Sequence, residues 1–505
     1  MVKLYKITVL ILLSLLPVAV FAGRVNDTVT TLTVAQPLQS NMVVQQNKPF
    51  KVWGHLQAGK KITIKADWLT DAIMVTADKS NNFTGIITVP AIQKGDFSKH
   101  AITVESGPEK VTLNNLLIGD VWFCSGQSNM AFAVRELADP DKEMAAAHYP
   151  NIRLLGVKFN FKTEPTENIT GNWTECSPAS VKDFSAIGYF YAVELQKQLS
   201  IPIGVIYSGV GGSVAQAYVA RDVLAKDSLL NEAYLLPFYK KDSYKKNTLN
   251  SFDWGTTSYP YLIYNAMIYP FFNLSIKGFL WYQGESNREQ RDSYVKLNYT
   301  LIESWRKNFA QGNLPFYYVQ VAPYSYDKMD AALNDYAFFR EEQEKISKLG
   351  NTAMAVTMDV GEPKNIHPKD KKPVAERLAR IALNRTYNRL NVDYKGPHFD
   401  YAEFSKNKAV VHFEPESVTR GLKTNDGQAP KHFFLAGNDQ VFYPADASIT
   451  GKAVLLSCKK VKNPVAVRYA FTNYPITNFE NSAGLPAVPF RSDNWKEPDA
   501  YATSK

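Results

Sequence analysis

Residues 119–130 read Gly-Asp-Val-Trp-Phe-Cys-Ser-Gly-Gln-Ser-Asn-Met. The apolar first half is typical of a buried strand, Gly126 indicates a tight turn, and the polar residues after it are typical of a helix start. Ser128 stands in this turn, where a hydroxyl projects from a sheet edge toward the unpaired N–H groups of the next helix. We interpret Ser128 as a candidate nucleophile; the alternative is a serine that only caps the helix. Met130 replaces the second glycine of the Gly-x-Ser-x-Gly elbow, which indicates a fold other than the α/β-hydrolase.

From residue 116 to about residue 390, strand-like apolar runs alternate with amphipathic stretches, which is typical of βαβ units and a parallel sheet. The expected strands are 121–124, 152–157, 204–208, 278–282, 316–321 and 353–358. The expected helices are 131–147, 189–199, 294–309, 338–349 and 373–387. Ligands bind beyond the carboxyl ends of the strands in such sheets, so reactive side chains are expected just after them. We predict an α/β catalytic domain at 114–390.

Short β-rich runs separated by turn residues lie on both sides of this domain. Residues 23–113 are predicted to form an N-terminal β-sandwich-like module, which ends near the turn residues Gly107-Pro108 and Asn114-Asn115. Residues 391–505 are predicted to form a second β-rich module, with packing on the first as one arrangement. The expected strands are 42–44, 50–53, 61–65, 83–89 and 100–104 in the first module and 409–413, 433–435, 441–443, 453–458 and 466–471 in the second.

The composition is that of a soluble globular protein, and 505 residues are enough for two or three domains. Apolar residues make up 45% of the chain and charged residues 21%. We interpret the net charge of +9 as a solvated surface with scattered lysines such as Lys371 and Lys372. No basic run is interleaved with aromatic residues, so no nucleic-acid partner is expected.

The N-terminus is typical of a signal peptide. Lys3 and Lys6 precede an apolar run at 7–20, and Val20-Phe-Ala22 supplies the small residues at a cleavage site. Residues 1–22 are therefore predicted to be removed, and the protein to be exported, either periplasmic or secreted. The alternative is an uncleaved membrane anchor, although the run is shorter than the roughly 20 residues that a bilayer requires. No later stretch is apolar for long enough to predict a membrane span in the mature chain.

Cysteine and histidine spacing predicts neither a disulfide scaffold nor a metal site. Three cysteines are too few for such a scaffold, and Cys124 is expected to be a small core residue. No paired-cysteine cluster or His-Glu-x-x-His helix occurs, and no two of the seven histidines are spaced to share a metal. We therefore expect no metal and no cofactor.

Two further strand ends carry candidate oxyanion donors. Gly211 and Gly212 follow the apolar run at 203–208 and can expose backbone N–H groups, although an ordinary strand–helix connection is the alternative. Gln283, Glu285 and Asn287 follow the run at 276–282. The amide of Asn287 is a further candidate donor, with an Asx-type turn as the alternative.

His367 is the best base candidate among the seven histidines. It lies between Pro363 and Pro368 in the segment after the last expected strand, where a loop can aim its imidazole inward. The alternative is a histidine of a surface loop.

Together the four segments resemble the sialate O-acetylesterase family, a branch of the SGNH hydrolases. In that family a Gly-Gln-Ser-Asn-Met block carries the nucleophile, Gly-Gly and Trp-Tyr-Gln-Gly-Glu-Ser-Asn blocks form the oxyanion hole, and an Ile-His-Pro block carries the base. All four blocks are present, and the resemblance extends to Leu262–Met267, Arg340–Gln343, Arg377–Ala379 and Gly484–Pro486. It implies an SGNH-hydrolase-like, flavodoxin-like sheet. It also implies catalytic residues Ser128 and His367 and an oxyanion hole of Ser128, Gly211, Gly212 and Asn287.

One departure from the family pattern concerns the third member of a triad. Many SGNH enzymes have an aspartate three residues before the histidine, and this chain has Lys364 there. We favour a Ser–His dyad whose imidazole Nδ1–H is held by a backbone carbonyl, such as that of Asn365. Asp359 and Glu285 remain alternative acids.

The resemblance implies an acetylated sugar as substrate, with 9-O-acetylated sialic acid first and acetylxylan or another plant glycan as the alternative. Gln127 and Gln283 are expected to bind substrate. Arg135 is expected either to face a sugar carboxylate or to be a solvated helix arginine. A non-catalytic carbohydrate-binding protein is the alternative from another class, and a lipase or thioesterase is a weaker one. The presence of Ser128, Asn287 and His367 counts against a binding protein.

Overall fold

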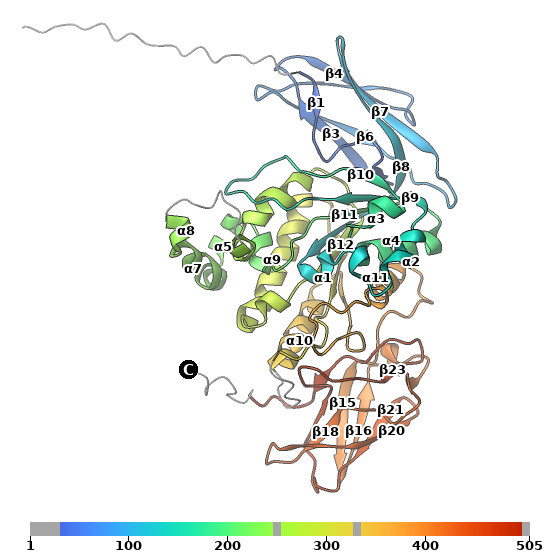
Figure 1. The fold of residues 1–505 in the computed structure, drawn as a ribbon, viewed down its shortest axis with the longest axis vertical. Helices are drawn as coiled ribbons and strands as arrows, with labels where there is room; N and C mark the ends of the chain where they lie inside the picture. The colour runs from blue at the N-terminus through green and yellow to red at the C-terminus, as the bar shows by residue number, and fades with distance from the viewer. Residues whose placement is uncertain (1–30, 246–253, 327–334, 497–505) are drawn as a thin grey trace, which may run out of the picture.

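The structure is a computed structural model that describes residues 31–245, 254–326 and 335–496. The predicted signal peptide lies outside these residues. Figure 1 shows three parts along the longest axis: N-terminal strands at one end, a sheet covered by helices in the middle, and C-terminal strands at the other end. No helix among the described residues has both the length and the apolar character that a membrane span requires.

The central part is an α/β structure, as predicted. Its strands follow the order β10 (Trp173–Cys176), β9 (Tyr149–Gly156), β11 (Ile203–Tyr207), β8 (Glu109–Gly126), β12 (Gly278–Tyr282), β13 (Phe316–Val319) and β14 (Thr352–Ala355). Neighbours from β9 to β14 pair in parallel, and β10 pairs antiparallel with β9. The expected strands in this part are all present, because each is an apolar run bounded by glycine or polar residues.

Both faces of this sheet are buried, which explains the unbroken apolar run in β8. Phe123 packs in a cluster with α9 (Arg291–Phe309), and Trp122 and Cys124 pack in another with α4 (Ala186–Leu199) and α11 (Lys372–Arg385). Cys124 is therefore a core residue, as predicted, and all three cysteines are buried and unbridged.

The prediction of a single helix at 131–147 is wrong. The segment contains α1 (Ser128–Ala131), a 3-10 turn η1 (Val134–Glu136) and α2 (Pro140–Ala145). Phe132 leaves the helical region at ψ 115°, and Pro140 can begin a helix but cannot lie in its interior. The other expected helices are present as α4, α9, α11 and α10 (Asp335–Lys345).

Strand β8 is 18 residues long and runs through the boundary predicted at 113/114. Its first half pairs with β7 (Lys99–Ser106) and β2 (Val43–Gln45), and its second half with β11 and β12. Asn115, at φ +55°, is accommodated within the strand rather than ending it. The remaining N-terminal strands are β1 (Thr33–Val34), β3 (Pro49–His55), β4 (Lys61–Ala66), β5 (Ile73–Thr76) and β6 (Asn82–Thr88).

The C-terminal part contains two four-stranded sheets and a two-stranded ribbon. One sheet has the order β15 (Phe399–Ser405), β16 (Lys408–Phe413), β21 (Ala453–Ser457) and β20 (Asp446–Thr450). The other has the order β19 (Phe442–Pro444), β18 (Phe433–Ala436), β22 (Ala466–Tyr469) and β24 (Phe490–Arg491), and β17 (Leu422–Thr424) pairs with β23 (Phe479–Asn481). The prediction that the C-terminal β-rich module packs on the N-terminal one is wrong, since the two β-rich parts lie at opposite ends (Figure 1).

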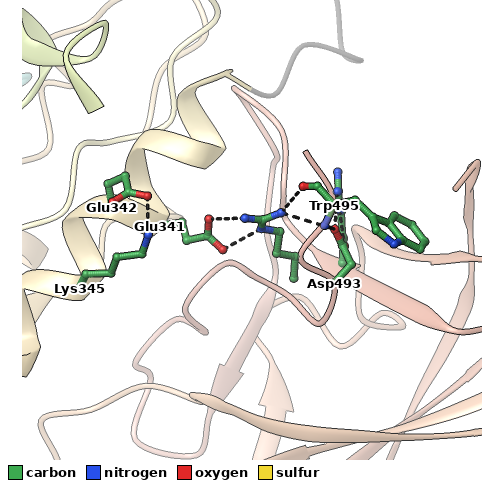
Figure 2. A network of polar contacts seen from close by, with 7 residues as sticks. Glu341, Glu342, Lys345, Asp493 and Trp495 are labelled. Carbon is green, nitrogen blue, oxygen red and sulfur yellow. Dashed lines mark hydrogen bonds and ion pairs between the residues drawn. The ribbon is translucent and has the colours of Figure 1, made fainter. Parts of the chain in front are cut away.

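An ion pair joins the C-terminal sheets to the α/β part. Arg491 of β24 donates to both carboxylate oxygens of Glu341 in α10, at 2.8 and 3.0 Å, and to the carbonyl of Trp495 at 2.7 Å. Figure 2 shows Glu341 on the helix facing the C-terminal segment that carries Asp493 and Trp495. The C-terminal strands therefore contact a helix that belongs to the central part.

Candidate active site

The loops that follow β8, β11 and β12 meet because these strands are neighbours in the parallel sheet. Gly126 at the end of β8 is in register with Tyr282 at the end of β12, and Cys124 with Tyr207 at the end of β11. Gln127 donates its backbone N–H to the carbonyl of Tyr282 at 2.9 Å. The segments expected to carry the nucleophile and the oxyanion donors are thus brought to one edge.

Gly126 permits the turn that exposes Ser128. Its φ is +140°, and a Cβ at this position would lie 2.2 Å from the carbonyl oxygen of Tyr282. Only glycine allows so close an approach of the two strand ends. Gln127 then occupies the N-cap and Ser128 is the first residue of α1, so the alternative that Ser128 is the N-cap is wrong. The first N–H groups of a helix have no intrahelical partner, and that of Ser128 is one of them.

His367 reaches the serine hydroxyl from the segment after β14. Its Nε2 lies 2.7 Å from Oγ of Ser128, a hydrogen-bond distance between residues 239 positions apart. Asn365 holds the loop: its Oδ1 accepts the backbone N–H of His367 at 3.0 Å, and its Nδ2 donates to the His367 carbonyl at 2.7 Å. No hydrogen bond among the described residues reaches Nδ1 of His367, so Asn365 positions the backbone of His367 and not its ring nitrogen.

The two alternative acids are engaged elsewhere. Both carboxylate oxygens of Asp359 accept from Arg377 in α11, at 2.8 and 2.6 Å. Glu285 is buried, and its Oε1 accepts from Nδ2 of Asn129 at 2.5 Å. Within the part of the chain that the structure describes, neither carboxylate is hydrogen-bonded to His367. The geometry therefore presents a Ser–His pair without an acid at Nδ1.

Gly211 and Gly212 lie beside the serine with their backbone donors unused. A Cβ at Gly211 would lie 3.8 Å from the Cβ of Ser128, so the glycine backbone runs past the nucleophile. No acceptor for the N–H of either glycine occurs among residues 31–245, 254–326 and 335–496. These donors, with the N–H of Ser128, are available for an oxyanion.

Asn287 takes a role other than the expected one. It is fully buried, and its Nδ2 donates to Oε1 of Gln216 at 2.9 Å and to Oε1 of Gln290 at 2.7 Å. Its Oδ1 accepts the N–H of Ala215 at 2.9 Å and Nε2 of Gln283 at 2.6 Å. Both amide hydrogens are committed, so Asn287 braces the loops and has no donor left for an oxyanion.

The glutamines predicted to bind substrate differ from each other. Gln283 is 1% exposed and hydrogen-bonds through both ends of its amide, so it is a buried brace and not a substrate contact. Gln127 accepts at Oε1 from Gln283, Gly284 and Ser286. Its Nε2 has no partner in the described part of the chain, so Gln127 retains donors next to the nucleophile.

Arg135 lies on the surface just after α1. It forms an ion pair with Asp183 and is exposed. Its guanidinium thus already faces a carboxylate of this protein, and a contact with a sugar carboxylate stays a prediction.

No role was predicted from the sequence for two buried residues beside the pair, Asn129 and Lys371. Lys371 is 1% exposed, so its interpretation as a surface lysine is wrong, whereas Lys372 is exposed as expected. Nζ of Lys371 donates to Oδ1 of Asn129 at 2.5 Å. A signal was present, because Lys371 has the helical spacing of Val374, Ala375 and Leu378 on the buried face of α11.

Burial shifts the protonation of the site. It lowers the pKa of His367, the ammonium of Lys371 lowers it further, and Glu136 opposes both. Burial also lowers the pKa of Lys371 to about 7 and raises that of Glu285. His367 is therefore neutral at neutral pH and able to accept the proton of Ser128. In the described residues no group of three histidine, cysteine or acidic side chains is placed to hold a metal.

This geometry lies within a region that matches a known family. Residues 118–384 match the sequence profile of a family described as carbohydrate esterase, sialic acid-specific acetylesterase. The sialate O-acetylesterase of Mus musculus is 26% identical over 509 residues, which cover 89% of this chain and 92% of that protein. The human sialate O-acetylesterase is 25% identical over 499 residues, which cover 90% of this chain and 91% of that protein.

A solved structure has the same overall architecture. The carbohydrate acetylesterase from Xanthomonas citri superposes with a TM-score of 0.81 at 31% sequence identity. The alignment covers 92% of this chain and all of that one, at 100%. The similarity thus includes both β-rich parts as well as the central sheet.

Proposed function

Because the chain belongs to the carbohydrate esterase family of sialic acid-specific acetylesterases, we propose that it removes O-acetyl groups from carbohydrates through an acetyl-enzyme on Ser128. It is a carboxylic ester hydrolase of the carbohydrate O-acetylesterase type. The observation that carries the mechanism is the 2.7 Å contact between Nε2 of His367 and Oγ of Ser128. A nucleophile is activated in this way when a base lies within hydrogen-bond distance.

The reaction has two halves. Oγ of Ser128 attacks the acetyl carbonyl carbon while Nε2 of His367 takes the hydroxyl proton, and the oxyanion accepts from the N–H of Ser128 and of Gly211 or Gly212. The bond to the sugar oxygen then breaks, and His367 returns its proton to that oxygen. Water next attacks the acetyl-enzyme and gives a proton to His367. Acetate leaves as that proton returns to Ser128. Gln127, whose Nε2 has no partner among the residues that the structure describes, is expected to bind the substrate.

Removal of either member of the pair tests this mechanism. Ser128→Ala and His367→Ala are each expected to lower kcat for p-nitrophenyl acetate by at least about 10³-fold, with the circular dichroism spectrum unchanged. Ser80→Ala, at an exposed serine between β5 and β6 of the N-terminal part, serves as the control. Equal rates for the wild-type protein and Ser128→Ala would contradict the mechanism and favour a non-catalytic carbohydrate-binding protein. Rapid turnover of long-chain p-nitrophenyl esters would favour a lipase or thioesterase.

We propose 9-O-acetylated sialic acid as the substrate. The family description and the mammalian relatives, which are named for sialate, support this choice. Acetylxylan or another plant glycan is the alternative, because the Xanthomonas citri relative is named only a carbohydrate acetylesterase. Acetate release from both substrates, measured side by side, separates the two. A higher kcat/KM on acetylxylan would overturn the sialic acid assignment.

Two further assignments accompany this function. The parallel sheet, with the nucleophile directly after β8, supports an SGNH-hydrolase-type fold for the central part. Export by a signal peptide at 1–22 is also proposed. N-terminal sequencing of the mature protein from periplasm or culture fluid is expected to begin at Gly23, and retention of Met1 would contradict cleavage.

A further inference from the structure

A buried lysine lies beside the Ser–His pair, and the proposed reaction does not use it. Lys371 is 1% exposed at the start of α11. Lysine is almost never fully buried without a partner, because loss of hydration disfavours its charge. Its Nζ donates to Oδ1 of Asn129 at 2.5 Å and lies 4.6 Å from the ring centroid of Phe132. So costly a burial next to a reactive centre indicates a function.

Asn129 connects this lysine to the other loops of the site. It is 1% exposed and directly follows the nucleophile. Its Nδ2 donates to Oε1 of Glu285 at 2.5 Å and to the carbonyl of Ile366 at 3.0 Å. One amide thus bridges α1, the loop after β12 and the residue before His367. Lys371 fixes the orientation of that amide, because an ammonium can only donate and must face its oxygen.

The charged groups around Lys371 come from three segments: the loop after β12, η1, and the segment between β14 and α11. The acidic ones are Glu285, Glu362, Glu136 and Asp370, and the basic neighbour is His367. Of the acids, Glu285 alone is buried, and its Oε2 has no hydrogen-bond partner among the described residues. The lysine and Glu285 thus form a buried pair of opposite charge, bridged by Asn129.

We propose that Lys371 is a positioning residue of the Ser–His pair: its ammonium holds the Asn129 bridge in place, and its charge keeps His367 in the neutral, proton-accepting form. This inference rests on the proposed function. In this arrangement the contact of Asn129 with the Ile366 carbonyl helps to orient the base, whose Nδ1 meets no acid within the described part of the chain.

The protonation order follows from burial. Burial lowers the pKa of Lys371 to about 7, so this group takes up a proton first as the pH falls. Once charged, it opposes a second positive charge on the neighbouring imidazole. Activity therefore falls on the acid side of the pH profile, in the acid limb, and the midpoint of this fall is expected below the ordinary histidine pKa of about 6.5.

Lys371→Met removes the charge and keeps a long side chain. The acid limb of kcat/KM for p-nitrophenyl acetate is expected to move to higher pH by about one unit, because the imidazole loses a repelling neighbour. Lys371→Arg keeps the charge and is expected to keep the limb where it is. Lys372→Met, at the exposed neighbouring lysine, is the matched control and is expected to match the wild type.

The outcomes separate this inference from the proposed function. An unshifted limb in Lys371→Met, with Ser128→Ala inactive, overturns the role of Lys371 and leaves the esterase mechanism standing. An active Ser128→Ala overturns the mechanism itself. A fall in kcat without any movement of the limb indicates a merely structural lysine and also overturns the inference.

A second measurement titrates the wild-type protein and uses a variant only to assign the signals. The ring protons of His367 are followed by NMR across pH 4–9 in the wild-type protein, with His367→Asn for assignment. An imidazole pKa below 6.5, with a second small step near pH 7 as Lys371 ionises, supports the inference. A pKa of 6.5 or above, or a curve with a single step, overturns it.

Discussion

The hydrogen-bond donors around Ser128 fall into two sets, backbone N–H groups and side-chain amides. The N–H groups of Ser128, Gly211 and Gly212 have no partner among the described residues, whereas the amides of Asn287 and Gln283 are hydrogen-bonded within the protein. A buried polar group without a partner is costly, so we expect substitutions of Asn287 and Gln283 to lower the stability of the protein first and its activity only as a consequence.

Asn287→Ala is expected to lower the free energy of unfolding by about 2–3 kcal/mol, because it leaves the buried N–H of Ala215 without its acceptor and removes one acceptor of the Gln283 amide. Urea denaturation measures the loss. Ser286→Ala, next along the chain and partly exposed, is the control and is expected to change little. Unchanged stability with a hundredfold fall in kcat would instead identify Asn287 as an oxyanion donor.

Asp359→Asn is expected to affect folding more than catalysis. Its carboxylate forms a two-point ion pair with Arg377, which ties the segment after β14 to α11. The loss is expected to be about 1–2 kcal/mol, with kcat within about tenfold of the wild type. A double-mutant cycle with Arg377→Met is expected to show non-additive losses. A fall in kcat of several orders of magnitude in a folded protein would make Asp359 the missing acid and contradict the dyad.

At the scale of residues, the sequence was sufficient to place some side chains of the candidate site and not others. Ser128, Gly211 and His367 follow apolar runs whose carboxyl ends share an edge, so their convergence was predictable. The partners of Asn287 were not, because Gln216 and Gln290 come from segments without a recognisable pattern. The burial of Lys371 was missed because lysine is usually a surface residue, although its helical spacing with the buried face of α11 was a signal.

At the scale of elements, strands were predicted better than turns. Strand β12 coincides with the expected 278–282, since it is apolar throughout and bounded by polar residues. The predicted boundary at 113/114 failed because Asn114-Asn115 is typical of a turn, yet Asn115 adopts φ +55° inside β8. The helix at 131–147 failed because the apolar spacing continued across the point where Phe132 leaves the helical region.

Gly126→Ala is expected to disrupt the turn between β8 and α1. The added methyl group would lie 2.2 Å from the Tyr282 carbonyl, and φ +140° disfavours any side chain. We expect destabilisation by more than about 3 kcal/mol and loss of esterase activity. Gly107→Ala is the matched control, since Gly107 also has positive φ, at +57°, but has open space around it. It is expected to cost about 1 kcal/mol in urea denaturation. Equal effects would contradict a steric requirement at Gly126.

At the scale of the molecule, the C-terminal sheets are attached to the central part by buried hydrogen bonds, ion pairs and apolar packing. The pair of Arg491 and Glu341 in Figure 2 is partly buried, with side chains 16% and 25% exposed. Such contacts have no periodicity in the sequence, which is why the placement of the C-terminal part was not predictable. Its strands, by contrast, were expected from short β-rich runs.

Arg491→Leu is expected to lower the free energy of unfolding by about 1–2 kcal/mol, because it removes both hydrogen bonds to the carboxylate of Glu341. Urea denaturation and hydrogen exchange in β24 and α10 measure the effect. Lys110→Leu breaks an ion pair with Glu105 whose side chains are 59% and 46% exposed, and it is expected to change stability by less than about 0.5 kcal/mol. Equal losses would show that Arg491 is no more than a surface charge.

Strand β8 makes the N-terminal and central parts inseparable as pieces of protein. A polypeptide cut at residue 114 would start midway along a strand, deprived of β2 and of much of β7. The nucleophile stands at the far end of that same strand, two residues after Gly126. Recombination that exchanges whole modules between genes could therefore swap the C-terminal sheets of this enzyme far more readily than its N-terminal ones.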